Sequence, residues 1–282
     1  MTKQWLITGA SSGLGRALAE TVASNGDHVI AAARDVGALE DLVARHGAAI
    51  TPWKLDVTDR DAIADLAERA GPIDVLVNNA GYGFIAAVEE ADERDIRDQF
   101  EVNFFGAVAL TRALLPAMRQ RRSGWIVNVS SAAGVVSGAG AAFYSGSKFA
   151  LEAFSDALAA ELSPLGIGVT IVEPGALRTD FAGRSLRSSD KVAGHYETVE
   201  RTRSYLSHSN GMQMGDPVKA AILIAQAAGN ADAPLRLLLG PDCQQLVERR
   251  LSERLAEAQA QKETAASILF AEGQADLATP FD

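Results

Sequence analysis

The sequence contains a single cysteine, Cys243, and no apolar run long enough to span a membrane. One cysteine cannot form an intramolecular disulfide, and no cysteine pair is available to bind zinc. The histidines His28, His46, His195 and His208 are scattered, with no two at metal-ligand spacing, so we expect no metal site. The N-terminal residues lack the apolar stretch of a signal peptide, and we expect a cytoplasmic protein that does not enter a membrane.

Basic residues are also in short supply, because 26 Lys and Arg face 36 Asp and Glu, which gives a formal net charge of -10. Binding to nucleic acid or to an anionic membrane surface requires a basic face, so we expect neither kind of partner. Hydrophobic residues make up 48% of the 282 residues, which is enough to bury the core of one large domain.

Short runs rich in Val, Ile and Leu recur along the chain and predict strands. Between most of them, apolar residues recur at helical spacing, as Leu110, Leu114 and Met118 do. Strands that alternate with helices predict a parallel sheet with right-handed crossovers, hence a single-domain α/β fold with a doubly wound parallel sheet. The predicted strands are 5–8, 28–33, 50–55, 74–78, 125–129, 169–173 and 235–239.

The turn after the first predicted strand reads TGASSGLG (8–15) and leads into a predicted helix that begins near Leu14. Glycines in this place permit a tight turn, close approach of a ligand to the backbone, and close packing of helix on strand. The free N–H groups at the start of the helix attract phosphate, and two serine hydroxyls lie beside them. The pattern predicts a dinucleotide site that includes Gly9, Ser11, Ser12, Gly13 and Leu14.

The second predicted strand ends at Ala33 and is followed by Arg34 and Asp35. An acidic residue at this tip binds the ribose 2′-hydroxyl in NAD-dependent folds, whereas an arginine suits a 2′-phosphate. We therefore expect NADP(H), with NAD(H) as the less favoured cofactor. The alternatives are that Arg34 is only solvated or that Asp35 reads the ribose.

The next two strand ends also carry polar and small residues. Asp56 and Val57 are expected to bracket the adenine ring, and Asp59 is suited to cap the following helix. The segment NNAG (78–81) ends the fourth predicted strand, where Asn79, Ala80 and Gly81 would let backbone approach the second ribose. Alternatively, its asparagine side chains connect neighbouring strands.

The segment YSGSK (144–148) places Tyr144 and Lys148 on one face of a predicted helix. A phenol has a reference pKa of about 10, and a nearby ammonium lowers it, so the pair is suited to acid–base catalysis. Ser131 follows the fifth predicted strand, where a hydroxyl can hold a carbonyl oxygen during hydride transfer. The alternative is an ordinary surface pair of residues.

Taken together, TGASSGLG, NNAG, Asn103, Ser131, YSGSK and PGALRT (174–179) resemble the short-chain dehydrogenases/reductases over residues 3–240. The similarity is greatest to the group that holds 17β-hydroxysteroid and retinol dehydrogenases, through SKFALEAFSDALAAEL (147–162) and DAPLRLLLG (232–240). Two positions depart from the family: alanine is usual at Gly146, and asparagine is usual at Glu173.

The resemblance implies a Rossmann fold, roles for the matched residues, and a homodimer or homotetramer. Tyr144 would be the catalytic acid/base, Lys148 would bind the nicotinamide ribose and lower the tyrosine pKa, and Ser131 would orient the substrate oxygen. Asn103 would bend its helix and hold a water in a proton relay. The expected cofactor-binding residues are Gly9, Ser11, Ser12, Gly13, Leu14, Arg34, Asp56, Val57, Asn79, Ala80, Gly81, Tyr144, Lys148, Pro174, Gly175 and Thr179.

We therefore expect an NADP(H)-dependent oxidoreductase acting on a small carbonyl or alcohol substrate, with a nucleotide-sensing protein without turnover as the main alternative. An epimerase or dehydratase on the same fold is a third option. Several aromatic residues suggest an apolar substrate pocket, although such residues more often belong to a core. They are Phe84, Phe143, Phe181, Tyr196 and Tyr205.

The chain is expected to divide into a dinucleotide-binding and catalytic domain over 1–240 and a C-terminal helical extension of the same domain over 241–282. Within the first part, residues 181–214 are polar and unusually long for a connection, which is typical of a substrate lid or of a helical excursion on the surface. In the extension, Leu246, Val247, Leu251 and Leu255 lie at helical spacing and predict an amphipathic helix over 243–262.

Overall fold

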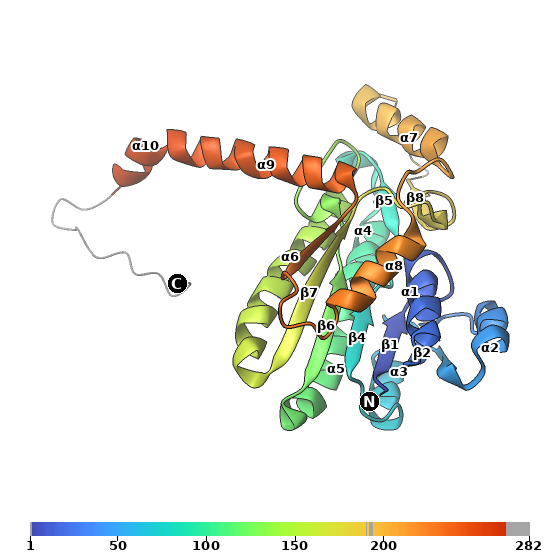
Figure 1. The fold of residues 1–282 in the computed structure, drawn as a ribbon. Helices are drawn as coiled ribbons and strands as arrows, with labels where there is room; N and C mark the ends of the chain where they lie inside the picture. The colour runs from blue at the N-terminus through green and yellow to red at the C-terminus, as the bar shows by residue number, and fades with distance from the viewer. Residues whose placement is uncertain (1, 190, 192–193, 269–282) are drawn as a thin grey trace.

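The computed structural model describes residues 2–189, 191 and 194–268, and at its centre lies a seven-stranded parallel sheet with helices on both faces (Figure 1). The strand order is β3-β2-β1-β4-β6-β7-β9, and each strand predicted from the sequence is present. The strands are β1 Gln4–Thr8, β2 His28–Ala33, β3 Ile50–Lys54, β4 Val75–Asn78, β6 Gly124–Val129, β7 Ile167–Pro174 and β9 Arg236–Leu239.

Alternate residues of the central strands face opposite helical layers, which is why the sequences of strands such as β1 and β2 are mostly apolar. In β1, Leu6 packs with the core on one side of the sheet, while its neighbour Ile7 packs with the core on the other. Leu18 of α1 and Ile224 of α8 belong to the same core as Ile7. Leu110 of α5 belongs to the core that contains Leu6. The helices are α1 Gly13–Ser24, α2 Glu40–His46, α3 Arg60–Arg69, α4 Glu93–Phe100, α5 Gly106–Arg121, α6 Ala142–Leu162, α7 Glu197–Ser209, α8 Pro217–Ala227, α9 Pro241–Ala260 and α10 Lys262–Ala266.

The strand order reverses direction between β1 and β4, because β2 and β3 extend the sheet to one side and β6, β7 and β9 to the other. The loops after β1 and β4 therefore leave in opposite directions and open a crevice at the carboxyl ends of the strands. In open α/β sheets this crevice is where ligands bind.

The described part of the long segment 181–214 forms a small layer above these strand ends. Its strand β8 (Leu186–Ser188) pairs in parallel with β5 (Gly83–Ile85), and its helix α7 contributes the buried Val199, which packs with Ile85. The Arg203 guanidinium of α7 forms an ion pair of 2.9 Å with the buried Glu90. The described part of the segment is thus attached to the body by both backbone and side-chain contacts.

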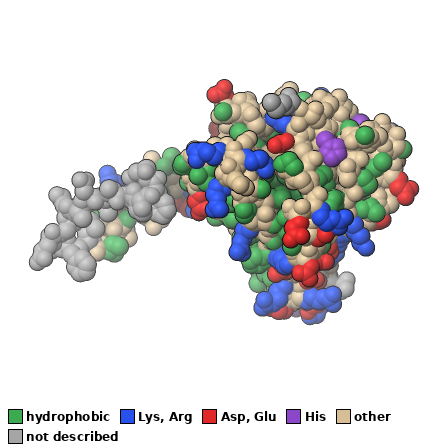
Figure 2. All heavy atoms as spheres, turned by 90° about the horizontal axis from the view of Figure 1, so that it is seen from below, with side chains coloured by type: hydrophobic (Ala, Val, Ile, Leu, Met, Phe, Trp, Pro, Cys, Tyr) green, Lys and Arg blue, Asp and Glu red, His purple; other side chains and the backbone are tan. Residues whose placement is uncertain are grey.

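Helix α9 matches the amphipathic helix predicted over 243–262, but only its first turns pack on the body. Cys243 and Val247 are buried, whereas Leu251 and Leu255 are 54% and 60% exposed. Figure 1 shows the helix projecting from the sheet, and Figure 2 shows the same projection beside a surface on which acidic and basic side chains are interspersed. Helical periodicity predicted the helix and could not show that its second half lacks a partner in the described chain. Residues 269–282 of the predicted extension lie outside the described residues.

No helix among the described residues is both long enough and apolar enough to cross a membrane.

The packing predicts different costs for two Leu→Ala substitutions. Leu110 is fully buried beneath the sheet, so Leu110→Ala should lower the free energy of unfolding by about 2–5 kcal/mol. Leu255→Ala, at the exposed end of α9, should change it by less than about 0.5 kcal/mol. Urea unfolding at low protein concentration measures both. Equal losses in the two variants would show that the end of α9 is part of the core.

Candidate active site

A cleft of about 1830 Å³ opens at the carboxyl ends of the strands, beside the point where β1 and β4 diverge. Every residue that the sequence predicted for cofactor contact lines this cleft, as do the catalytic candidates Ser131, Tyr144 and Lys148. Asn103 does not line it and lies behind its wall. The cofactor candidates on the wall are Gly9, Ser11, Ser12, Gly13, Leu14, Arg34, Asp56, Val57, Asn79, Ala80, Gly81, Pro174, Gly175 and Thr179.

The glycine turn is held against the end of β4 by contacts that leave no room for side chains. Gly9 and Gly13 have φ of +66° and +56°, a region that favours glycine. A Cβ on Gly15 would lie 2.3 Å from Asn79 Nδ2 and 2.5 Å from the Gly9 carbonyl oxygen. The turn can therefore close only with glycine at this position.

Thr8 joins the ends of β1 and β4, a function that the sequence analysis missed. Its hydroxyl donates to the Val77 carbonyl at 3.2 Å and accepts from the backbone N–H groups of Asn79 and Ala80, each at 3.0 Å. The Asn79 side chain donates back to the Thr8 carbonyl at 2.8 Å. Thr8 opens the glycine motif, so its position gave the only signal of this role.

The asparagines at the strand ends connect neighbouring elements, as one of the two sequence interpretations expected. Asn78 donates to the Asn128 side chain of β6 at 2.8 Å and to the Thr111 hydroxyl of α5 at 3.2 Å. Asn128 in turn donates to the Ser155 hydroxyl of α6 at 2.8 Å. These buried amides fix α5 and α6 relative to the sheet.

Helix α1 begins at the cleft with its backbone donors unused by a capping side chain. Ser12, its N-cap residue, makes no side-chain cap hydrogen bond within the described structure. Because the first N–H groups of a helix have no partner within it, they and the nearby hydroxyls form a site suited to phosphate. The residues present therefore fit the diphosphate of a nicotinamide dinucleotide.

At the tip of β2, Arg34 is exposed and forms no hydrogen bond or ion pair with the described residues, whereas Asp35 is engaged in its own turn. The Asp35 carboxylate accepts from the Gly37 N–H at 3.0 Å. The Asp56 carboxylate likewise accepts from the Thr58 N–H and hydroxyl, at 2.9 and 2.8 Å. Among these three charged side chains, only the Arg34 guanidinium has no hydrogen-bond partner in the described part of the chain.

Asp59 takes the capping role considered for it, because its carboxylate accepts from the N–H groups of Asp61 and Ala62 at the start of α3, each at 3.0 Å. It does not line the cleft.

Asn103 lies in a π-helical segment, Glu101–Phe105, between α4 and α5. Its side chain donates to the Tyr82 carbonyl at 3.0 Å and to the Ser147 hydroxyl at 3.2 Å, and it accepts from the Tyr82 N–H at 3.0 Å. The wider helical turn thus connects the loop after β4 with the helix that carries Tyr144 and Lys148.

Tyr144 and Lys148 lie at the start of α6, facing Ser131 across the cleft floor. The Lys148 ammonium is buried and donates to the Val129 carbonyl at 2.8 Å. Burial lowers the pKa of Lys148 to about 8, against the opposing negative charge of Glu152. The ring of Phe181, from the segment above, lies 5.8 Å from that of Tyr144.

The pKa of Tyr144 departs from the sequence expectation, which was that Lys148 would lower it. Burial raises this pKa above its usual value, and a hydrogen bond with the Ser131 hydroxyl only partly opposes the rise. The reason is that a dry site disfavours the phenolate, and Lys148 is not among the groups that offset this burial. The described side chains therefore hold Tyr144 as the neutral phenol.

The five aromatic residues considered for a substrate pocket divide into two groups. Phe181 and Tyr205 line the cleft. Phe84 is buried in β5, and the centroid of its ring lies 6.4 Å from that of Phe143. Tyr196 packs with the small cluster around Ile85. Only two of the five are therefore placed to meet a substrate.

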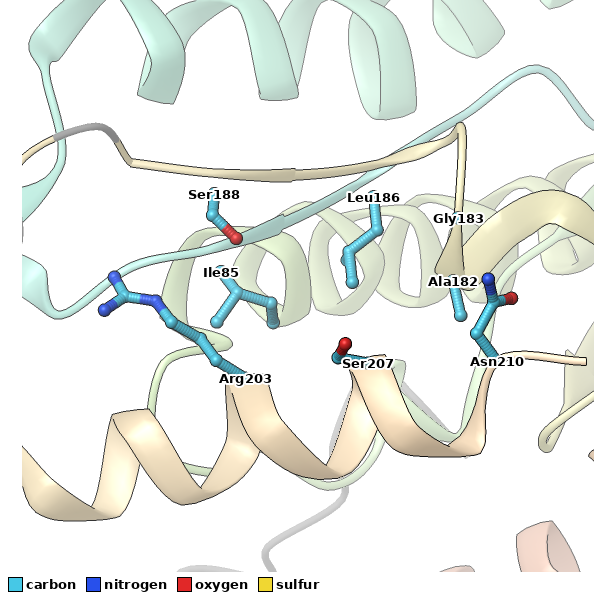
Figure 3. Close-up of a pocket in the computed structure, with 8 residues that line it drawn as sticks. All are labelled: Ile85, Ala182, Gly183, Leu186, Ser188, Arg203, Ser207 and Asn210. Atoms are coloured by element: carbon cyan, nitrogen blue, oxygen red, sulfur yellow. The ribbon is translucent and has the colours of Figure 1, made fainter. Parts of the chain in front are cut away.

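A second cavity of about 410 Å³ lies between α7 and the β5–β8 pair (Figure 3). It shares Ala182 with the large cleft. Arg203 at its end is already paired with Glu90 and Glu200, so its charge is balanced. The lining residues are Ile85, Ala182, Gly183, Leu186, Ser188, Arg203, Ser207 and Asn210.

The described residues contain no group of three or more His, Cys, Asp or Glu side chains that could hold a metal ion. His195 and His208 are exposed and line neither cavity.

A family model described as short chain dehydrogenase matches residues 3–190. Among curated proteins, Oxidoreductase BOA17 of Botryotinia fuckeliana is 42% identical over 247 residues, covering 86% of this chain and 90% of that protein. Retinol dehydrogenase 8 of Bos taurus is 36% identical over 251 residues, covering 82% and 79%.

The chain is also similar to solved structures of short-chain dehydrogenases. A short-chain dehydrogenase from Streptomyces avermitilis superposes with a TM-score of 0.88 at 45% identity, covering 94% of this chain and 98% of that one. A short chain dehydrogenase/reductase from Burkholderia phymatum in complex with NAD has a TM-score of 0.80 at 27% identity, covering 91% and 95%. A serine dehydrogenase complexed with NADP+ has a TM-score of 0.72 at 26% identity, covering 84% and 94%.

The geometry predicts that alanine substitutions at Gly15 and at Gly146 have different effects on cofactor binding and stability. Gly15→Ala should weaken binding of a nicotinamide cofactor at least about tenfold, because overpacking of about 1–3 kcal/mol must move the turn. Gly146→Ala should bind normally and gain about 0.5–1 kcal/mol of stability, since its Cβ would meet only Phe100 Cζ at 3.4 Å. Fluorescence titration with reduced cofactor and thermal unfolding test the pair. Unchanged binding in Gly15→Ala would contradict the closed turn.

Proposed function

This chain belongs to the short chain dehydrogenase family, and we propose on that basis that it is an NADP(H)-dependent oxidoreductase interconverting a carbonyl compound and a primary or secondary alcohol. The observation that carries the proposal is the meeting of Ser131, Tyr144 and Lys148 in the same cleft as the glycine turn. The bound nicotinamide would donate or accept the hydride at the substrate carbon.

In the direction of reduction, Tyr144 is the proton donor in this proposal. Burial keeps its hydroxyl protonated, and the phenol can donate to a carbonyl oxygen as that oxygen gains negative charge. The Ser131 hydroxyl, within reach of the Tyr144 oxygen, donates a second hydrogen bond to the same carbonyl oxygen. The buried Lys148 ammonium lies one helical turn away and is proposed to bind the nicotinamide ribose.

Asn103 is proposed to relay the replacement proton through a water near the π-helical turn. Its contacts with Tyr82 and Ser147 fix the amide within the protein, so the water would be held by the carbonyl groups of the widened helix.

The substrate is proposed to be a small molecule with an apolar part, because the open end of the cleft presents large apolar side chains. Residues 181–214 contribute most of these and are proposed to act as a lid over the nicotinamide end. Residues 241–282 are proposed to extend the same domain, which is proposed to form a homodimer or homotetramer. The apolar residues at the open end are Phe181, Tyr205, Leu206, Met212, Met214 and Leu246.

Tyr144→Phe should fold and bind cofactor normally and should lose about 10²–10⁴-fold in kcat, because only the proton-transferring oxygen is removed. Tyr205→Phe is the matched control, since Tyr205 lines the cleft but is 69% exposed, and it should keep its kcat. Steady-state kinetics on a panel of ketones, aldehydes and alcohols measures both variants.

A Tyr144→Phe variant that kept more than about a tenth of the wild-type kcat would remove the acid/base assignment. Tight cofactor binding by the wild-type protein with no turnover of any panel compound would favour a nucleotide-sensing protein instead.

Arg34 should set the preference for NADP(H). A guanidinium can hold a 2′-phosphate with two charge-assisted hydrogen bonds, which are worth about 1.5–3 kcal/mol, or about 10- to 150-fold in affinity. Arg34→Ala should therefore weaken NADP(H) by that factor and leave NAD(H) nearly unchanged. Adding Ala33→Asp should reverse the preference, because the new carboxylate repels a phosphate and accepts from a ribose hydroxyl.

The measurement is kcat/KM for both cofactors in the wild type and the two variants. A wild type that prefers NAD(H), or an Arg34→Ala variant that loses both cofactors equally, would assign the ribose contact to another residue.

A further inference from the structure

Behind the candidate active site, three carboxylates and one guanidinium meet between α6, β7 and β9. Arg236 of β9 places its Nε 3.4 Å from Glu152 Oε2 of α6 and 3.4 Å from Glu173 Oε1 of β7. Its Nη2 lies 2.6 Å from Asp156 of α6. One cation is therefore shared by three acidic side chains.

The three carboxylates differ in their access to water. The Glu173 side chain is fully buried and that of Glu152 is 9% exposed, whereas that of Asp156 is 49% exposed. The groups that stabilise the Glu152 carboxylate are the Ser130 hydroxyl and the Arg236 guanidinium, and Arg236 is the cation beside Glu173. Two buried carboxylates that share one guanidinium cannot both be ionised cheaply, so the pair is arranged to retain a proton.

The electrostatics agree with this geometry. Burial, with the adjacent charge of Glu152 as the second cause, raises the pKa of Glu173 to about 7. Burial also raises the pKa of Glu152. Because the charge of Glu152 contributes to the raised pKa of Glu173, the ionisation of the two carboxyl groups is coupled.

Glu152 connects this cluster to the catalytic residues. It lies one helical turn after Lys148 on α6, and its negative charge opposes the loss of the Lys148 proton that burial favours. It also packs beneath the turn that follows Ser131, because a Cβ on Gly134 would lie 3.0 Å from Glu152 Cγ and 2.6 Å from Ser130 Oγ. No carboxylate of the described residues forms an ion pair with the Lys148 ammonium, so the Glu152 charge acts at longer range.

We propose that Glu152 is a positioning residue that keeps Lys148 charged. Glu173 and Arg236 determine how much negative charge the Glu152–Glu173 pair presents to the Lys148 ammonium. This rests on the roles proposed above for Tyr144 as the proton donor and for Lys148 in the same site. As pH rises and Glu173 loses its proton, the cluster gains one negative charge. The added charge favours the ammonium form of Lys148 at the pH where burial would otherwise deprotonate it.

The other groups around Glu173 do not reverse the effect that its ionisation has on Lys148. The Cys243 thiol donates to the Glu173 carbonyl at 3.0 Å, and burial raises its pKa to about 12, so it stays neutral. Asp242 and Asp156 add negative charge, which acts in the same direction as Glu152. The titratable and charged groups facing the cluster are Lys148, Glu152 and Asp156 of α6, Arg236 of β9, and Asp242 and Cys243 of α9.

The first test follows the titration of Lys148 directly, in the full-length protein labelled with ¹³C-lysine. The ¹³Cε signal, assigned with a Lys148→Arg variant, should titrate near pH 8 in the wild type. In Glu152→Gln the midpoint should fall by about one pH unit, the low end of the effect of a nearby opposite charge. Glu173→Gln should lower the Lys148 midpoint by less than Glu152→Gln does. Glu152→Asp keeps a carboxylate, so its midpoint should lie between those of Glu152→Gln and the wild type.

Asp156→Asn is the matched control, because it removes a half-exposed Arg236 partner at the outer end of the cluster, and its Lys148 midpoint should fall by clearly less than that of Glu152→Gln. A Lys148 midpoint that is unchanged in Glu152→Gln overturns the proposal. If Glu152→Gln does not fold, Glu173→Gln decides, and an unchanged midpoint there overturns it equally.

The second test is the pH profile of turnover. The alkaline limb of kcat should move to lower pH in Glu152→Gln by the same amount as the Lys148 midpoint, with little change in substrate KM. A structural defect alone would lower kcat at every pH and would leave the limb in place, which would overturn the proposal. Because the NMR titration needs no substrate, a shifted Lys148 midpoint supports the charge coupling even if no carbonyl compound is turned over, an outcome that would remove only the proposed function.

Discussion

The hydrogen bonds that join the carboxyl ends of β1 and β4 are the constraint on which the rest of the site depends. Across the point where the two strands part, the Thr8 hydroxyl bonds three backbone groups of residues 77–80, and the Asn79 side-chain amide donates to the Thr8 carbonyl. Buried polar groups in this position need partners, since an unpaired donor or acceptor costs about 1–3 kcal/mol. Their pairing brings Asn79 against Gly15, and only glycine then lets α1 begin close enough for its free N–H groups to face the cleft.

The same requirement organises the catalytic wall. Asn78, Asn128 and Ser155 form a buried chain of hydrogen bonds from β4 through β6 to α6. Asn103 closes the opposite side by bonding the loop after β4 to Ser147 of α6. Helix α6 is therefore held at both edges by polar contacts, which fixes Tyr144 and Lys148 relative to the strand that carries Ser131.

Burial then controls the charge of these residues. The pKa of Tyr144 rises and that of Lys148 falls to about 8 because the site excludes water, so both groups are disposed toward their neutral forms. A site that needs an ammonium must supply negative charge from behind it. Glu152, one turn along the same helix, is the group that opposes the loss of the Lys148 proton, and Arg236 stabilises its negative charge.

The sequence by itself determined the sheet, its strands and the residues that line the cleft, because these follow from local periodicity and from motifs confined to single turns. Cys243 and Glu173 show its limit: both are visible in the sequence, but their burial beside α6 depends on where β7, β9 and α9 pack. Only the tertiary structure decided that Phe84 belongs to the core while Phe181 faces Tyr144, and that the second half of α9 leaves the body. It also decided the direction of the Tyr144 pKa, because desolvation is a property of all the chain packed around a group and not of its neighbours in sequence.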